Sequence, residues 1–388
     1  MACFTGSFAI NVTLALIKAS TEQILIFRVM KYLLIVALIF IFSQNQELFG
    51  QSTKTDSLIS YYAKEHQFNG TILVQKDGAK FYNNSFGIAD RQFDVPVTNE
   101  TIYKIASVTK TFTAVLILQL YEHQKIDLNQ TIKTYLPNYK GEAGTKVTIH
   151  ELLNHTSGMR NIDTIKSIES ALKYGLGLYQ KPFTSNQLLN DFCSDSLINI
   201  PGKKFDYNNG EYIILGKIIE AIYGRSYDEI VNEKILKPLG MKNSGMLYQQ
   251  NIIKHLANSY FLRTDTKQLI CDLPIYIENW YAAGAMYSCT DDLMKFSNAL
   301  YGLRLINKAS LELMINPGLD DYGYSVWISD TKGDNTRYKR VERFGSIMGS
   351  NAVWMHFLNK DLTIIILSNT NLTDLGDYGF SIAKMIIN

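Results

Sequence analysis

The sequence predicts an α+β fold: one antiparallel sheet is built from both ends of the chain and flanked by helices, with an all-helical region inserted. Three observations predict it. Strand-like runs lie at residues 70–86 and again between 324 and 367, whereas residues 165–245 have apolar side chains at helical spacing. The 388 residues are 46% hydrophobic and 19% charged, which is typical of a globular chain with a large core.

The N-terminal part of the sheet is predicted from a hairpin. Residues 70–76 read as one strand, Asp77-Gly78 is a two-residue turn signal, and residues 80–86 form the returning strand. The other expected elements are an apolar helix from 107 to about 124, a short helix over 147–153 with Thr148 as N-cap, a buried helix that includes 213–220, strands over 324–329, 352–357 and 362–367, and a final helix over 375–387.

The N-terminus has the pattern of a secretory signal. Residues 30–50 contain one early positive charge, an apolar run of about eleven residues and a polar continuation. The run is shorter than the about 20 residues of a membrane span, although an uncleaved anchor is the alternative. We interpret residues 1–29 as an extension upstream of the true start at Met30. We therefore expect a secreted or periplasmic protein.

Residues 51–388 are expected to form a single domain. Its α/β part covers about 56–106 and 285–388, and its helical part covers about 107–284. The formal net charge of +2 gives no reason to expect nucleic acid or an anionic membrane surface as a partner. No C-x-x-C or zinc spacing occurs among the cysteines, so we expect no metal site; they are Cys3, Cys193, Cys271 and Cys289. One disulfide is the alternative in an oxidising compartment, but we expect none.

The most informative motif is Ser107-x-x-Lys110 at the start of the apolar helix. A three-residue separation places both side chains on one helix face, so the amine can reach the hydroxyl. Serine is a poor nucleophile until a base activates it, and lysine acts as that base only where burial or nearby charge lowers its pKa. The same spacing occurs elsewhere without an apolar helix, at Ser170/Lys173, Ser329/Lys332 and Ser381/Lys384.

The second candidate is Tyr207-Asn208-Asn209, in a turn that follows Pro201-Gly202. A tyrosine near cations can have its pKa lowered and carry a proton. Asn209 can hydrogen-bond a substrate carbonyl or the lysine. The pattern is weak by itself, because Tyr82-Asn83-Asn84 also has it.

Five stretches, in order, resemble the class C type of serine β-lactamases and their relatives, the penicillin-binding DD-peptidases and esterases. They are 105–114, similar to the nucleophile helix; 147–159, similar to "TI..LL.HTSG"; 201–216, similar to "PG..F.Y.N..Y..LG"; 238–241, "PLGM"; and 283–293, similar to "AGG.YST..DL". The resemblance spans about 56–388. It implies the β-lactamase/transpeptidase-like fold and chemistry without a metal or organic cofactor.

The resemblance also implies roles for matching positions. Ser107 would be the acylated nucleophile, and Lys110 would assist its deprotonation. Tyr207 would shuttle a proton to and from the leaving group, while Asn209 would steady the substrate. Whether the lysine or the tyrosine is the base stays open, since a coupled pair can share the role.

A third family element, a Lys or His, a small residue and then Gly on an edge strand, aligns with Arg343, Phe344 and Gly345. The glycine lets substrate lie against the strand, and the N–H groups of Ser346 and Ser107 would form an oxyanion hole. Arg343 supplies a permanent cation that can hold a carboxylate bidentately. Phe344 replaces the small residue that helps hold that carboxylate, which argues against β-lactam and D-Ala-D-Ala recognition but not against acyl transfer.

We therefore expect a secreted serine hydrolase that acts on an ester, amide or peptide. The substrate would be a small molecule or peptide, and a cell-wall fragment is one candidate. One alternative is a D-Ala-D-Ala carboxypeptidase or β-lactamase proper. Another is a catalytically inactive protein that binds peptides or wall fragments in the same cleft.

Two other patterns carry no function. His150 and His155 resemble the zinc motif H-E-x-x-H, but they are five residues apart and point to different helix faces. No G-x-S-x-G elbow occurs, which argues against an α/β-hydrolase.

The segment 163–179 and the Trp280-Tyr281 pair are expected at the rim of the cleft.

Overall fold

The computed structural model describes residues 30–31, 56–165, 167–332 and 337–387. The chain divides into two compact units, residues 1–58 and 59–388, and the second is the unit considered below. Apart from 30–31, the expected signal segment lies outside the described residues. Within the described part of the chain, no helix is both long and apolar enough to cross a membrane.

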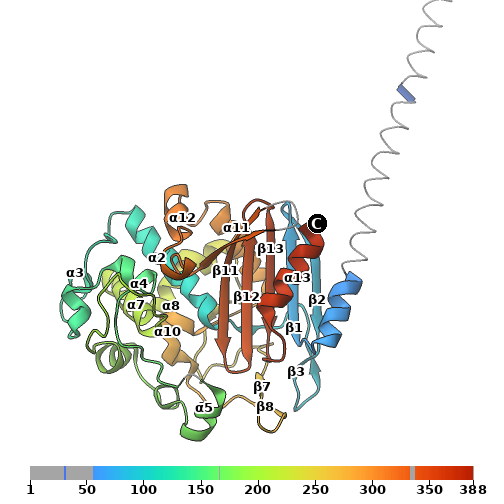
Figure 1. The fold of residues 1–388 in the computed structure, drawn as a ribbon, viewed down its shortest axis with the longest axis horizontal. Helices are drawn as coiled ribbons and strands as arrows, with labels where there is room; N and C mark the ends of the chain where they lie inside the picture. The colour runs from blue at the N-terminus through green and yellow to red at the C-terminus, as the bar shows by residue number, and fades with distance from the viewer. Residues whose placement is uncertain (1–29, 32–55, 166, 333–336, 388) are drawn as a thin grey trace, which may run out of the picture. The chain divides into compact units, whose positions relative to one another are not determined.

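A six-stranded sheet is the centre of the second unit (Figure 1). All its neighbouring strands pair antiparallel. Its order is β10 (Trp327–Lys332), β11 (Arg337–Ile347), β12 (Ser350–Phe357), β13 (Leu362–Ser368), β1 (Gly70–Lys76) and β2 (Ala79–Phe86). Strands from both ends of the chain therefore share one sheet, which confirms the predicted α+β class.

The sheet separates two hydrophobic cores because successive strand residues face opposite sides. Ile72 and Val74 pack in the core that includes Tyr378 and Ile382 of α13 (Leu375–Ile387). Leu73 lies in the other, larger core, which includes the helices around the nucleophile. Figure 1 shows α13 lying across one face of the central strands.

Local sequence signals explain several of these elements. Asp77 and Gly78 have positive φ angles of 50° and 74°, as expected for the two-residue hairpin turn. Thr148 caps α4 (Ile149–Leu153), and its capping box with Glu151 confirms the predicted N-cap. Strand β10 begins later than predicted, because Ser325 has a φ of 68° that interrupts an extended run.

Most of the regular secondary structure in the segment inserted between the sheet strands is helical. The principal ones are α2 (Thr109–Glu122), α4, α5 (Ile168–Tyr174), α7 (Asn209–Tyr223), α8 (Tyr227–Val231) and α10 (Tyr281–Gly284), followed by α11 (Thr290–Tyr301) and α12 (Lys308–Met314). The insert also contains a short hairpin that the sequence did not reveal, β7 (Tyr260–Leu262) with β8 (Leu269–Cys271). Three-residue strands leave too little alternation to be recognised.

Candidate active site

The candidate nucleophile Ser107 lies in a single 3₁₀ turn, η1 (Ala106–Val108), which runs directly into α2. Ala106 has a φ of 45°, a left-handed conformation that is strained for a residue with a side chain. The turn is held from outside, since the Ile105 N–H donates to the Met286 carbonyl at 3.0 Å. Ser107 is thus placed at the start of the helix by the surrounding structure.

Strand β11 passes close beside this turn because residue 345 is glycine. A Cβ at Gly345 would lie 2.3 Å from the Ile105 carbonyl oxygen and 3.0 Å from the Ser107 nitrogen. Any other residue would force the strand away. The next residue, Ser346, is exposed beside the same turn. This approach is compatible with the predicted oxyanion hole, whose two N–H donors stay a prediction.

Lys110 is fully buried and reaches three oxygens. Its Nζ lies 3.2 Å from Ser107 Oγ and 2.5 Å from Asn209 Oδ1. It also lies 2.8 Å from the carbonyl of Ala283 in α10. Burial is the largest influence on this amine and lowers its pKa to about 8, with Arg343 adding to the effect and Tyr207 opposing it.

These three contacts suit a lysine that exchanges a proton. The Asn209 and Ala283 oxygens can only accept hydrogen bonds, so they take two N–H donors in either charge state. In the neutral amine the remaining position is a lone pair directed at Ser107 Oγ. The arrangement can therefore receive the serine proton without breaking the other two hydrogen bonds.

Tyr207 contacts the nucleophile from the other side. Its hydroxyl donates to Ser107 Oγ at 2.8 Å and accepts from Arg343 Nη2 at 2.5 Å. Burial raises the pKa of Tyr207, but the nearby charges of Arg343 and Lys110 outweigh it and lower the pKa overall. A phenolate is thus stabilised within hydrogen-bond distance of the serine.

Arg343 is fully buried, and its guanidinium is committed within the protein. Nε donates to the Ser107 carbonyl at 2.8 Å and Nη2 to Tyr207. Nη1 donates to the Tyr322 hydroxyl at 2.7 Å and to the Ser325 carbonyl at 2.9 Å. Four of its five N–H donors are therefore occupied. The structure places Arg343 at the site but behind Tyr207.

Phe344 is 36% exposed, and its ring lies close to Gly376 in the first turn of α13. Its ring lies 6.1 Å from that of Trp327, and Trp327 in turn stacks on Tyr207 at 6.1 Å with 16° between the planes. The three rings form an aromatic row that runs from Tyr207, whose hydroxyl contacts Ser107, to the exposed ring of Phe344; we call this row the Trp327 wall.

Asn209 links the lysine to an acid. Its Oδ1 accepts from Lys110, while its Nδ2 donates to Asp163 Oδ2 at 2.8 Å. Asp163 also accepts a hydrogen bond from the Tyr179 hydroxyl. The structure therefore brings together Ser107, Lys110, Tyr207, Asn209 and Arg343, with Gly345 and Ser346 on the adjoining strand.

A β-lactamase family model matches residues 55–380 of this chain. The chain belongs to the β-lactamase family. This membership confirms the predicted fold and the prediction that the protein is a β-lactamase-related serine hydrolase.

Individual relatives span most of the domain. Penicillin-binding protein 4* of Bacillus subtilis is 28% identical over 338 residues, or 81% of this chain and 70% of that protein. The teichoic acid D-alanine hydrolase of Staphylococcus aureus is 25% identical over 72% of this chain and 65% of that protein. The crystal structure of D-amino acid amidase from Ochrobactrum anthropi SV3 shares the fold, with a TM-score of 0.74 and 19% identity over 86% of this chain and 99% of that one.

Sequence reasoning missed a buried acid in this β-lactamase-family site. Glu211, in the first turn of α7, is hydrogen-bonded to His155 Nδ1, and both side chains are buried. Burial raises the pKa of Glu211 well above its usual range and lowers that of His155 well below, so burial favours the neutral form of both groups. The His155 ring lies 4.3 Å from that of Tyr207. The available signal was the position of Glu211, a carboxylate directly before the uncharged run 212–216 of α7.

Tyr322 was also missed as a site residue, although its hydroxyl holds Arg343. It lies in a loop before β10, and nothing in its local sequence marks a long-range contact.

The two histidines of the zinc-like pattern have separate partners. His150 Nδ1 is 2.7 Å from the Tyr324 hydroxyl, and His155 contacts Glu211. The described residues contain no group of His, Cys, Asp and Glu able to hold a metal. Of the cysteines in the described ranges, Cys193, Cys271 and Cys289 are all free thiols, and Cys3 lies outside these ranges.

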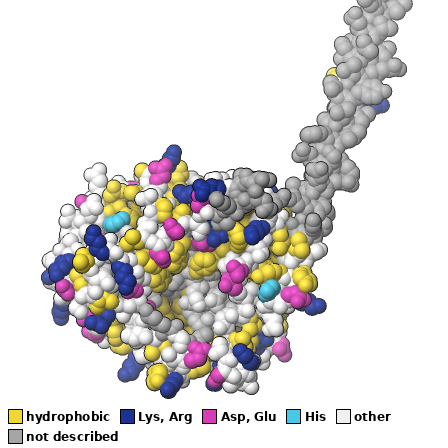
Figure 2. All heavy atoms as spheres, viewed as in Figure 1, with side chains coloured by type: hydrophobic (Ala, Val, Ile, Leu, Met, Phe, Trp, Pro, Cys, Tyr) yellow, Lys and Arg dark blue, Asp and Glu magenta, His cyan; other side chains and the backbone are white. Residues whose placement is uncertain are grey.

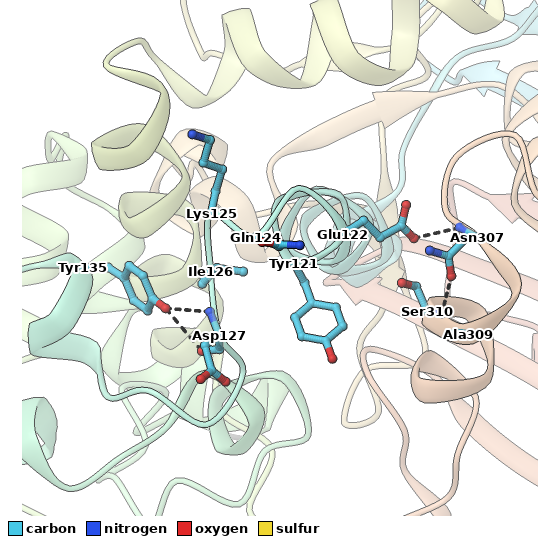
Figure 3. Close-up of a pocket in the computed structure, with 10 residues that line it drawn as sticks. All are labelled: Tyr121, Glu122, Gln124, Lys125, Ile126, Asp127, Tyr135, Asn307, Ala309 and Ser310. Carbon is cyan, nitrogen blue, oxygen red and sulfur yellow. Dashed lines mark hydrogen bonds between the residues drawn. The ribbon is translucent and has the colours of Figure 1, made fainter.

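A separate cavity of about 520 Å³ lies at the C-terminal end of α2, between Tyr121, Tyr135 and Asn307 (Figure 3). It contains none of the predicted site residues. On the face of the described residues that Figure 2 draws, Lys and Arg side chains are interspersed with Asp and Glu. That mixture differs from the basic stripe typical of nucleic-acid binding.

Proposed function

We propose that this protein is an exported serine hydrolase that cleaves esters or amides whose leaving group carries no carboxylate. Ser107 Oγ attacks the carbonyl carbon, and its proton passes to the coupled pair of Lys110 and Tyr207. The N–H groups of Ser107 and Ser346 stabilise the oxyanion. The carbonyl–leaving-group bond then breaks, and the leaving group takes a proton from Tyr207.

Water completes the cycle. It attacks the acyl-enzyme and gives a proton to the same pair, and Ser107 regains its hydroxyl when the acid is released. Export rests on the signal pattern of residues 30–50 and stays a prediction.

The commitment of Arg343 is the observation that carries the restriction on substrate. A carboxylate is held well by two parallel N–H groups of one guanidinium. Here the guanidinium is fully buried, with donors taken by Ser107, Tyr207, Tyr322 and Ser325. Binding a carboxylate would break contacts that also hold Tyr207 in place. We therefore propose that Arg343 positions Tyr207 and stabilises the negative charge of its phenolate form.

The Trp327 wall supports the same substrate class. The family resemblance implies a small residue at position 344, and Phe344 instead adds an exposed apolar ring to this wall. Burying a leaving-group carboxylate against such rings costs free energy because nothing replaces its hydration. An uncharged alcohol or amine leaving group fits the wall better.

The relatives support a hydrolytic role on ester or amide bonds. One of them is named for hydrolysing D-alanine from teichoic acid, and a substrate derived from the cell wall is consistent with an exported protein. The D-Ala-D-Ala carboxypeptidase and β-lactamase alternatives require the carboxylate contact that Arg343 does not offer.

Intact-mass spectrometry tests this proposal. The purified mature protein and a Ser107→Ala variant are incubated with a fluorophosphonate probe and, separately, with benzylpenicillin. We expect a fluorophosphonate adduct that maps to Ser107 and is absent from the variant, and no stable penicillin adduct or penicillin hydrolysis.

The two reagents give separate outcomes. Folded protein that does not react with the fluorophosphonate would be a binding protein and not an enzyme. A penicillin adduct on Ser107 would show that the site accepts a carboxylate, and it would move the function to a penicillin-recognising peptidase or β-lactamase.

A further inference from the structure

We infer that Asp163 binds a cationic amino group on the acyl part of the substrate, so that the preferred substrates are aminoacyl esters or amides with a free amine. This inference rests on the proposed function and narrows its substrate class.

The position of Asp163 is fixed relative to the nucleophile. Its Oδ2 accepts from Asn209 Nδ2 at 2.8 Å, and the other end of that amide contacts Lys110 Nζ at 2.5 Å. Tyr179 holds the second carboxylate oxygen, and its ring stacks on Trp280 at 3.5 Å with 6° between the planes. The side-chain amide of Asn209 therefore bridges the carboxylate of Asp163 and the amine of Lys110.

Asp163 has no cationic partner among the residues that the structure describes. Among the described residues, none of the Lys, Arg and His ion pairs includes this half-buried carboxylate. Its two hydrogen-bond partners are both neutral, and an ionised carboxylate has about four acceptor sites. Two sites thus remain for donors. A half-buried charge without a partner is unfavourable, and an ammonium group would supply the missing charge.

The charge of Asp163 also opposes catalysis until such a group binds. The titratable and charged groups around Lys110 are Tyr207, Tyr212, Arg343, Asp163, and the His155–Glu211 pair. Burial has the largest effect on the pKa of Lys110, and Asp163 raises that pKa. A substrate ammonium beside Asp163 would cancel this effect and favour the neutral amine when substrate is present.

Matched substrates test the inference. Methyl esters of D- and L-phenylalanine are compared with their N-acetyl derivatives at pH 6, where the α-amino group of an amino-acid ester is largely protonated although the ester lowers its pKa below the about 7.7–8.0 of an ordinary α-amino group. We expect wild-type kcat/KM to be roughly 10- to 100-fold higher for the free amine of the preferred enantiomer, the effect of one charge-assisted hydrogen bond. The ratio should fall toward one in Asp163→Asn, whose amide can still pair with Asn209 and Tyr179.

The control is Asp191→Asn, an exposed acid outside the site, which should keep the wild-type ratio. Equal wild-type rates on both esters, or an Asp163→Asn variant that slows both by the same factor, would overturn the inference. In those cases fluorophosphonate labelling of Ser107 would still support the proposed serine hydrolase function. Loss of labelling in folded wild-type protein would overturn both.

Discussion

Two regions of the molecule carry the same four-residue pattern in different surroundings. Lys110 is fully buried, and its amine has three oxygen partners. Lys173, three residues after Ser170 in α5, is exposed, and its Nζ lies 4.9 Å above the Tyr174 ring. The Ser170 hydroxyl contacts its neighbour Ser167 at 3.2 Å. Spacing alone therefore does not make a base; burial and converging partners do.

Replacing each lysine by methionine should give the largest difference in activity and stability between the two regions. Lys110→Met removes the amine that takes the serine proton, so kcat/KM for an ester substrate should fall by about 10²- to 10⁴-fold. It also leaves the buried oxygens of Asn209 and Ala283 without a donor, at about 1–3 kcal/mol of stability. Steady-state kinetics and thermal unfolding measure the two effects.

Lys173→Met is the matched control. An exposed surface substitution should change stability by no more than about 0.5 kcal/mol and leave turnover at the wild-type rate. If folded Lys110→Met kept normal turnover, Tyr207 alone would be the base.

Tyr207→Phe tests the second half of the coupled pair. Loss of the hydroxyl removes the hydrogen bonds to Ser107 and Arg343, and the aromatic ring can still pack against His155 and Trp327. We expect kcat to fall about 100-fold with the fold retained, measured together with circular dichroism. The corresponding change outside the site, Tyr174→Phe, should have no kinetic effect. Normal turnover in Tyr207→Phe would remove tyrosine from the proton path.

The sequence was sufficient for parts of the site that depend on local order. Ser107 and Lys110 are one helical turn apart, and the ordered motifs around Tyr207 and Asn209 identified the family before any contact was known. The strands that form the sheet from both ends were likewise visible as apolar runs. These features follow from spacing along the chain.

Other parts depend on contacts between distant segments. The predicted role of Arg343 came from its chemistry, but its four partners come from the nucleophile turn, Tyr207 and the loop before β10. Asp163 was expected only as part of a rim, and its contact with Asn209 crosses 46 residues of sequence. No local pattern encodes which acceptor a buried guanidinium or carboxylate will meet.

Arg343 gives the smallest expected effect, a shift in pH dependence. Burial is the largest influence on both pKa values, lowering that of Lys110 and raising that of Tyr207, and the charge of Arg343 lowers both. Removing this charge therefore raises both pKa values, whichever group is the base. The ascending limb of kcat/KM against pH should move to higher pH in Arg343→Gln.

Arg343→Lys separates charge from hydrogen bonding. This variant keeps a positive charge but loses the planar guanidinium and its fixed hydrogen-bond geometry. The ascending limb of its kcat/KM against pH should therefore lie closer to that of the wild type, while its kcat falls. The pH profiles are compared on variants whose unfolding temperatures show them to be folded. If folded Arg343→Gln showed the same ascending limb of kcat/KM against pH as the wild type, Arg343 would not set the pKa values of Lys110 and Tyr207. The contrast between Lys110 and Lys173 would then rest on burial alone, without a contribution from the neighbouring fixed charge.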